Sequence, residues 1–186
     1  MSPRHASTIT LEHVLLALLD QRPMHGYELY QELCGLKGIS QVWNIKQGLL
    51  YAILDKLEDR GLLSSHLVQG ETYPPRKDFQ LTEAGKASLQ TWLKTPVRRA
   101  RDVRQEFLAK LIVAHRYGIS QVLELIHVQE QACQTWIDEL QMNAPLLNKE
   151  NMDEWFVYSF RLNREQGALQ WLKMCELEIE HLLEEV

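Results

Sequence analysis

The segment KQGLLYAILDKLEDRGLL, residues 46–63, carries the clearest helical pattern in this chain of 186 residues. At 100° per residue its apolar side chains fall on one side of a helix, and Gln47 and Tyr51 fall on the other. We predict a helix over residues 44–60 that ends at Gly61, because glycine readily adopts the left-handed conformation found after a helix C-terminus. The predicted apolar face consists of Leu49, Leu50, Ile53, Leu54 and Leu57.

Two helices are predicted before this segment. Thr10 is expected to cap the first helix, and Pro23 to end it. Its apolar residues recur at helical spacing: Leu11, Val14, Leu15, Leu18 and Leu19. A short second helix follows Gly26 and is closed by Gly35 and Gly38. We expect it to present Tyr27, Tyr30 and Leu33 on one side.

A hairpin and a further helix are predicted after it. Residues 63–68 and 76–81 resemble two strands joined by a turn that contains Gly70, Pro74 and Pro75. Thr82 is expected to cap a helix that reaches Lys94. Three helices followed by a hairpin is the order of a winged helix-turn-helix. We therefore predict a winged helix-turn-helix domain over residues 1–95.

The rest of the chain is predicted to be helical, over residues 102–117, 120–142 and 152–186, with a break at Pro145. The fold class is therefore mostly α, and residues 96–186 are expected to form an all-helical dimerisation domain. The last helix would be about 50 Å long at 1.5 Å per residue. Two rows at seven-residue spacing predict a dimer seam, which Glu165 and Glu176 interrupt. The alternative is packing within the chain. The predicted seam residues are Trp155, Tyr158, Leu162, Leu169, Leu172, Ile179, Leu183 and Val186.

Composition excludes several classes of protein. With 45% hydrophobic and 24% charged residues, the chain has the composition of a globular protein rather than a disordered one. The net charge of −5 lies wholly in residues 96–186, which carry 10 basic and 15 acidic residues against 10 and 10 in residues 1–95. We therefore expect a polyanion to meet the first half. Membrane spans and a leader are not expected, and the three cysteines (Cys34, Cys133, Cys175) lack disulfide spacing, which favours a cytoplasmic protein with reduced thiols.

The polar side of the 44–60 helix is the first candidate binding surface. The N-terminal part of a recognition helix reaches base edges in the major groove, and Asn or Gln amides pair with adenine. Gly48 is costly in a helix, which the close approach of a phosphate or backbone would explain. The alternative is a solvated helix face. The candidate DNA contacts here are Asn44, Lys46, Gln47 and Tyr51.

Two basic clusters are the second candidates. Arg76 and Lys77 follow two prolines at the hairpin tip, where they suit a wing laid along a phosphate backbone; the alternative is an ordinary surface pair. A second cluster follows Pro96 and either reaches flanking phosphates or belongs to a solvated linker. It consists of Arg98, Arg99, Arg101 and Arg104.

Catalytic signatures are not found in the sequence. It contains no HExxH, CxxC, GxGxxG, P-loop or GxSxG motif, so we expect neither an enzyme nor a metal site or cofactor. Trp136, Trp155 and Trp171 either line a pocket for a flat ligand or belong to a core or interface. The cysteines are expected to be small core residues, with a redox role as the alternative.

Four linked segments resemble the PadR family of transcriptional regulators: LEHVLLALLDQRPMHGYELYQEL, KQGLLYAILDKLEDRGLL, PPRKDFQLTEAG and RQEFLAKL. The resemblance implies a homodimeric winged-helix regulator, commonly a repressor, that binds a palindromic operator. It also places Gln47 and Tyr51 on the recognition helix and Arg76 and Lys77 on the wing. Phe79 stands where the family often has tyrosine. Many members respond to small aromatic or hydrophobic effectors.

We therefore expect a DNA-binding regulator without enzymatic activity, whose partners are double-stranded operator DNA, a second copy of the chain and an effector. The rival interpretation is a winged-helix adaptor that binds protein through the face carrying Gln47 and Tyr51.

Overall fold

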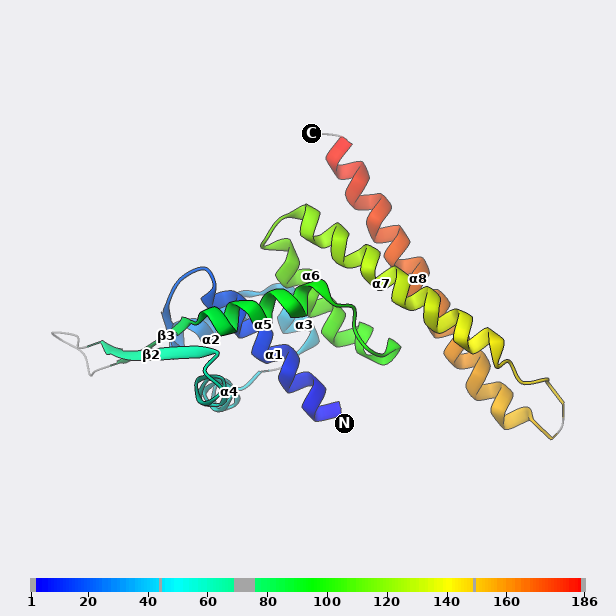
Figure 1. The fold of residues 1–186 in the computed structure, drawn as a ribbon, viewed down its shortest axis with the longest axis horizontal. Helices are drawn as coiled ribbons and strands as arrows, with labels where there is room; N and C mark the ends of the chain where they lie inside the picture. The colour runs from blue at the N-terminus through cyan, green and yellow to red at the C-terminus, as the bar shows by residue number, and fades with distance from the viewer. Residues whose placement is uncertain (1–2, 44, 69–75, 149, 185–186) are drawn as a thin grey trace.

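The computed structural model describes residues 3–43, 45–68, 76–148 and 150–184, with side chains from residue 9 onward (Figure 1). Asn44, the hairpin tip with Pro74 and Pro75, and Val186 lie outside the described residues. The mostly helical winged-helix architecture predicted from the sequence is confirmed.

In its described residues, the first half contains five helices and a small sheet. The helices are α1 (Pro3–Leu19), α2 (Gly26–Gly35), α3 (Lys37–Val42), α4 (Gln47–Asp59) and α5 (Glu83–Lys94), and the strands are β1 (Met24–His25), β2 (Leu63–Val68) and β3 (Arg76–Leu81). The sheet is antiparallel in the order β1-β3-β2. The β2–β3 hairpin projects away from the helices, with α4 beside its base (Figure 1).

Local sequence patterns correctly predicted where several helices and strands begin or end. Both strands of the hairpin have the predicted bounds. Thr82 caps α5, since its side chain accepts a hydrogen bond from the Gly85 amide at 3.1 Å. Gly61, at φ 68°, follows the end of α4 as predicted. Strand β1 was not predicted, because two residues are too few to show alternation; it pairs Met24 with Phe79.

Four expectations about the helices of the first half were wrong. Thr10 does not cap α1: the helix begins at Pro3, a residue type favoured in the first helical turn, and Thr10 is buried inside the helix. Helix α4 begins at Gln47 rather than at residue 44, and Leu49 is 44% exposed rather than part of the apolar face. Gly38 does not end the helical region but lies inside α3.

Gly38 has a packing role in α3. A Cβ at this position would lie 2.7 Å from the Cδ1 of Ile112, which belongs to α6 (Leu108–His115). Glycine therefore allows α3 to pack closely on α6, and this contact joins the two halves of the chain.

The second half is a helical arm. After a 3₁₀ turn η1 (Ala100–Asp102) and a π-helical turn η2 (Val103–Phe107), α6 leads into the long helices α7 (Ile119–Met142) and α8 (Met152–Glu184). Helices α7 and α8 pack side by side and extend away from the winged half (Figure 1). One continuous hydrophobic core runs from α1 to Leu172 in α8. The division at residue 95 stays a prediction.

Some of the α8 residues predicted to form the dimer seam pack against other helices of the same chain. Leu172 is fully buried, and Leu169 and Ile179 pack against the core. Leu172 therefore has no surface left for a second copy, and the intrachain alternative applies to it. The dimer seam as a whole stays a prediction. Helix α8 also exposes apolar side chains along its length: Phe156, Val157, Phe160, Met174, Leu177, Leu182 and Leu183. At 100° per residue, Phe156, Phe160, Met174 and Leu177 lie on the side opposite Leu172.

Within the described ranges, none of the helices combines the length and apolar character that crossing a bilayer requires.

Candidate DNA-binding surface

The first turn of α4 is open to solvent. Lys46, Gln47, Gly48 and Leu49 are all exposed. The N-cap position is the extended Lys46, and no side chain of the described residues caps the helix. Free backbone N–H groups and the helix dipole make such an end attractive to phosphate oxygens. The structure thus presents two of the predicted contacts, Lys46 and Gln47, at one exposed helix end.

Tyr51 lies one turn further along α4 and is 39% exposed. Its ring rests against Gly26 at the start of α2: a Cβ on Gly26 would lie 2.4 Å from Tyr51 Cε1. The ring is therefore held from one side and open on the other. Gly26 acts here through its lack of a side chain, a role that the sequence analysis did not assign to it.

His25 and Tyr27 form a second aromatic group beside this contact. His25 caps α2, since its Nδ1 accepts a hydrogen bond from the Glu28 amide at 3.1 Å. Its ring stacks on Tyr27 with a centroid distance of 6.5 Å. Tyr27 is 52% exposed, although Leu33, which was predicted on the same side of α2, is buried together with Leu29. Sequence reasoning missed Tyr27 as a surface candidate.

The wing cations are partly engaged by acids. Arg76 pairs with Asp78 at 3.5 Å, and Lys77 Nζ donates to Glu58 Oε2 at 2.5 Å. Glu58 also accepts a hydrogen bond from Ser65 Oγ, so one carboxylate of α4 holds both hairpin strands. The hydrogen bond from Lys77, and then that from Ser65, lowers the pKa of Glu58. Lys77 as a phosphate contact stays a prediction.

The positive charges near the C-terminal end of α4 are paired with a carboxylate of α1. Glu12 is buried and accepts from Lys56 Nζ and from Arg60 Nη1, both at 2.6 Å. Of the cations near α4 that the structure describes, Lys46 is in no ion pair. The uncompensated positive charge therefore lies at the end of α4 that carries Gln47.

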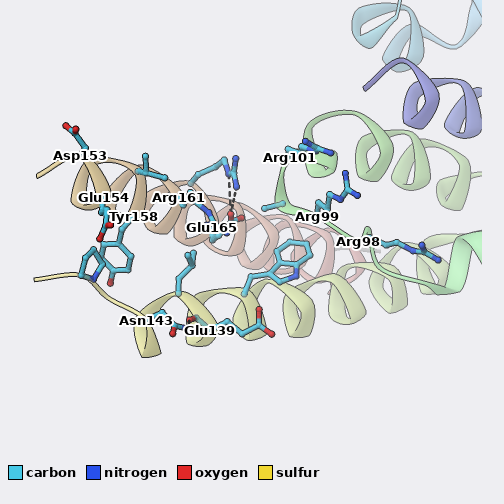
Figure 2. A pocket seen from close by; sticks show the side chains of 16 residues that line it. Arg98, Arg99, Arg101, Glu139, Asn143, Asp153, Glu154, Tyr158, Arg161 and Glu165 are labelled. Carbon is cyan, nitrogen blue, oxygen red and sulfur yellow. Dashed lines mark hydrogen bonds and ion pairs between the residues drawn. The ribbon is translucent and has the colours of Figure 1, made fainter. Parts of the chain in front are cut away.

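A second feature is a groove of about 1140 Å³ between the start of the arm, α7 and α8 (Figure 2). Its lining includes Trp136 and Tyr158 and five arginines: Arg98, Arg99, Arg101, Arg161 and Arg164. Three members of the linker cluster thus line the groove. Of the tryptophans, Trp155 packs edge-on against Phe156 and Trp171 against Phe107.

Glu165 lies in the middle of this lining and is 3% exposed. Arg164 donates to its Oε1 at 2.6 Å, whereas its buried Oε2 has no hydrogen-bond partner among the described residues (Figure 2). Acidic residues Glu139, Asp153 and Glu154 line the other end of the groove. The groove therefore offers cations, flat aromatic surfaces and one unsatisfied acceptor.

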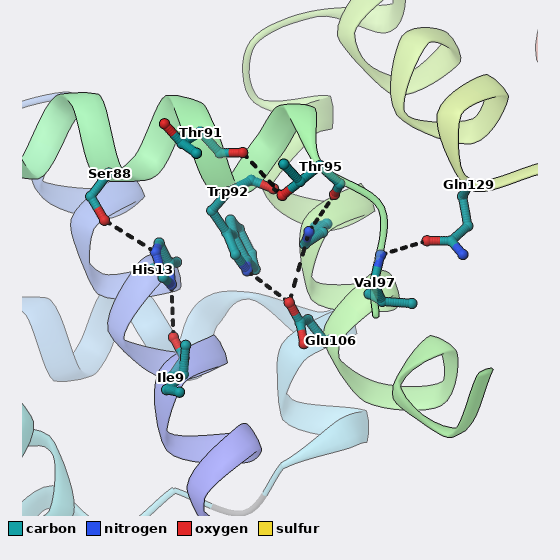
Figure 3. Close-up of polar contacts among 10 residues, drawn as sticks. Ile9, His13, Ser88, Thr91, Trp92, Thr95, Val97, Glu106 and Gln129 are labelled. Atoms are coloured by element: carbon teal, nitrogen blue, oxygen red, sulfur yellow. Dashed lines mark hydrogen bonds and ion pairs between the residues drawn. The ribbon is translucent and has the colours of Figure 1, made fainter. Parts of the chain in front are cut away.

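A polar network joins the winged half to the arm (Figure 3). The His13 ring of α1 stacks on Trp92 of α5 at 4.9 Å, and Trp92 Nε1 donates to Glu106 at 3.1 Å. Lys110 is 1% exposed and donates to the Thr95 carbonyl at 2.6 Å. Burial lowers the pKa of Lys110 to about 8.

The connection itself is held from α7. The buried amide of Val97 donates to Gln129 Oε1 at 2.9 Å (Figure 3). Gln129 Nε2 contacts Cys133 Sγ at 3.7 Å. Residues 95–97 are therefore fixed by side chains of α6 and α7 rather than being a loose linker.

Comparison with known proteins finds a similarity to one family. Residues 15–91, which include α2, α4 and the hairpin, match the model of the transcriptional regulator PadR-like family. The winged half of the chain is thus similar to this family. The chain is 24% identical to the negative transcriptional regulator PadR of Bacillus subtilis over 172 residues, which is 88% of this chain and 93% of that protein.

Two solved structures of Bacillus subtilis PadR are also similar. The complex with operator DNA is 22% identical, covers 89% of this chain and 97% of its own, and has a TM-score of 0.45. The complex with p-coumaric acid is 23% identical, covers 92% and 99%, and has a TM-score of 0.41.

Proposed function

We propose that this PadR-like protein is a cytoplasmic, homodimeric repressor that binds a palindromic DNA operator and is released from it by a small aromatic acid. The proposal rests above all on the open first turn of α4, where an uncapped helix end, Lys46 and Gln47 are exposed together. The relative from Bacillus subtilis, a negative regulator, supports repression.

Each exposed group of the surface has a distinct role in this proposal. The Gln47 amide offers both a donor and an acceptor to an adenine edge, and the open side of the Tyr51 ring offers an apolar contact. Lys46 and the backbone N–H groups of α4 bind phosphate, which fixes the position of the helix without reading sequence. Arg76 extends the phosphate contact along the hairpin.

The exposed face of α8 supports the homodimer. Its apolar residues are arranged symmetrically about Gly167: Phe160 and Met174 lie seven residues on either side, and Phe156 and Leu177 lie eleven and ten residues away. Nothing lies within 4 Å of the position of a Cβ on Gly167. A second α8 running antiparallel and crossing at Gly167 would pair Phe160 with Met174, as a two-fold interface requires.

The groove supports the effector. Its arginines suit a carboxylate, Trp136 and Tyr158 suit a flat ring, and the unsatisfied Glu165 Oε2 suits a hydroxyl donor. A solved complex of Bacillus subtilis PadR contains p-coumaric acid, a ligand with these three groups. The proposed effector class is therefore a phenolic acid.

DNA binding is tested by fluorescence anisotropy with fragments of the promoter regions flanking its own gene, at two salt concentrations. We expect affinity that depends on sequence and falls with salt. Gln47→Ala should lower the preference for the operator by about tenfold, at 1–3 kcal/mol per base contact. Gln134→Ala, on the exposed side of α7, is the matched control. Salt-independent binding without sequence preference would refute the proposal and favour the adaptor.

A further inference from the structure

A mixed cluster of metal-ligand side chains lies between α7 and α8, outside both the DNA-binding surface and the groove. His127 and Glu130 are three residues apart on α7, and Glu176 reaches them from α8. One ligand atom from each lies within 4.8 Å of the others. We propose that these three residues bind a divalent transition-metal cation of the zinc class.

The environment of Glu130 provides a second observation. Its Oε1 is buried and has no hydrogen-bond partner among the described residues. A carboxylate oxygen of Glu176 lies within 4.8 Å of a carboxylate oxygen of Glu130. Lys173 forms no ion pair with either carboxylate in the part of the chain that the structure describes. Two like-charged groups therefore face each other without a bound counter-charge.

The chemistry of the three ligands selects the class of metal. One imidazole nitrogen and two carboxylate oxygens suit Zn²⁺ and its neighbours, whereas Mg²⁺ and Ca²⁺ prefer oxygen ligands alone. Ligand bonds of about 2.1 Å place neighbouring ligand atoms about 3.4 Å apart in a tetrahedral site. Since His127 is exposed, turning its side chain closes the remaining distance without moving a helix. Water completes the coordination.

Gln131 supplies a partner for the imidazole. Its Nε2 lies 2.9 Å from His127 Nε2. A metal-bound histidine usually donates its other ring N–H to a neighbouring acceptor. The Gln131 amide can provide that acceptor by turning its oxygen toward the ring, since the two amide orientations have nearly the same shape. The site thus has three ligands and an orienting group.

Isothermal titration calorimetry of the full-length protein with ZnCl₂ and with MgCl₂ tests the proposal. We expect one Zn²⁺ per chain and at least tenfold weaker binding of Mg²⁺. His127→Ala and Glu176→Gln should each weaken Zn²⁺ binding by at least tenfold. His115→Ala and Glu180→Gln, which change exposed residues of the same types on α6 and α8, should leave it unchanged. Circular dichroism confirms that each variant is folded.

Cobalt substitution separates this site from the three free cysteines. Co²⁺ bound by nitrogen and oxygen gives weak visible bands without the intense thiolate charge-transfer band. A thiolate band that disappears in a Cys34→Ser variant, or Zn²⁺ affinity unchanged by both His127→Ala and Glu176→Gln, would overturn the proposal. Failure to bind Zn²⁺ at millimolar concentration would also overturn it. None of these outcomes bears on DNA binding, which is measured separately.

Discussion

Two glycines of the candidate DNA-binding surface, Gly26 and Gly48, have different surroundings. Gly26 is surrounded: a side chain there would collide with the Tyr51 ring. Gly48 is open: nothing lies within 4 Å of the position of a Cβ. Glycine at position 26 therefore leaves room for the Tyr51 ring in its present orientation, whereas at position 48 only a bound partner would require glycine.

The two glycine-to-alanine variants should therefore have different effects on the free energy of unfolding. Gly48→Ala should stabilise the protein by roughly 0.5–1 kcal/mol, because alanine favours helix, and yet weaken operator binding if DNA approaches α4 there. Gly26→Ala should displace Tyr51 and weaken binding without any gain in stability. Urea denaturation and anisotropy measure the two effects. Gly48→Ala that binds the operator as tightly as the wild type would show that no close approach occurs.

Lys110 makes stability depend on pH. Its pKa is about 8 in the folded protein, below the ordinary value of 10.5, so between these values the unfolded chain binds more protons at this residue. The free energy of unfolding should therefore rise between pH 8 and 10, by roughly 1–3 kcal/mol.

Lys110→Met should abolish most of that rise, whereas Lys94→Met, on the exposed side of α5, should retain it. Urea denaturation at pH 7.5 and 9.5 is the measurement. A Lys110→Met variant whose free energy of unfolding changes with pH as much as that of the wild type would show that Lys110 stays charged in the folded state.

Among the elements, the orientation of the hairpin against α4 depends on one carboxylate. Glu58 accepts hydrogen bonds from Ser65 of β2 and Lys77 of β3. It thereby competes with DNA for Lys77. This contact decides whether the wing contributes one cation to phosphate binding or two.

The salt dependence of DNA binding measures this competition. If Lys77 stays on Glu58 in the complex, Lys77→Ala should leave the slope of log K against log salt unchanged, and Glu58→Gln should steepen it by about 0.9. Arg76→Ala should reduce the slope by the same amount. A shallower slope in Lys77→Ala would instead assign Lys77 to a phosphate, as the sequence suggested.

Elements with strong local signals were predictable from the sequence. The hairpin strands, the Thr82 cap and α8 follow from alternation, capping chemistry and length. Strand β1 and α3 were not, because they are short and depend on tertiary partners, Phe79 and Ile112 respectively. The engagement of Lys77 by Glu58 joins residues 19 positions apart, and no local pattern reveals it.

At the scale of the whole molecule, α8 has two apolar sides. One side, with Leu172, packs into the core of its own chain, and the other, with Phe160, is 68% exposed at that residue. The heptad rows read from the sequence lie on the Leu172 side and include no residue of the Phe160 side. Periodicity shows that a helix face is apolar but not which helix covers it, so the sequence alone left these alternatives open.

Two variants separate the roles of these sides. Phe160→Lys should convert a dimer to a monomer while the chain stays folded, because it places a charge at the proposed crossing. Leu172→Ala should lower stability by about 2–5 kcal/mol through the cavity it leaves, without directly altering the dimer contact. Sedimentation velocity and urea denaturation distinguish them. A Phe160→Lys protein that remains dimeric would move the interface away from this face.

The Val97 amide held by Gln129 has a mechanical consequence. Because this hydrogen bond fixes the connection between the halves to α7, a displacement of α7 along its axis should move the winged half with it. A flexible connection would not transmit such a displacement. Shifts of about 1–2 Å at helix interfaces are typical of switching proteins. In the proposed dimer, the two α4 helices have to fit half-sites about 34 Å apart. A shift of this size at each connection would change the distance between the two helices and weaken their fit to the operator.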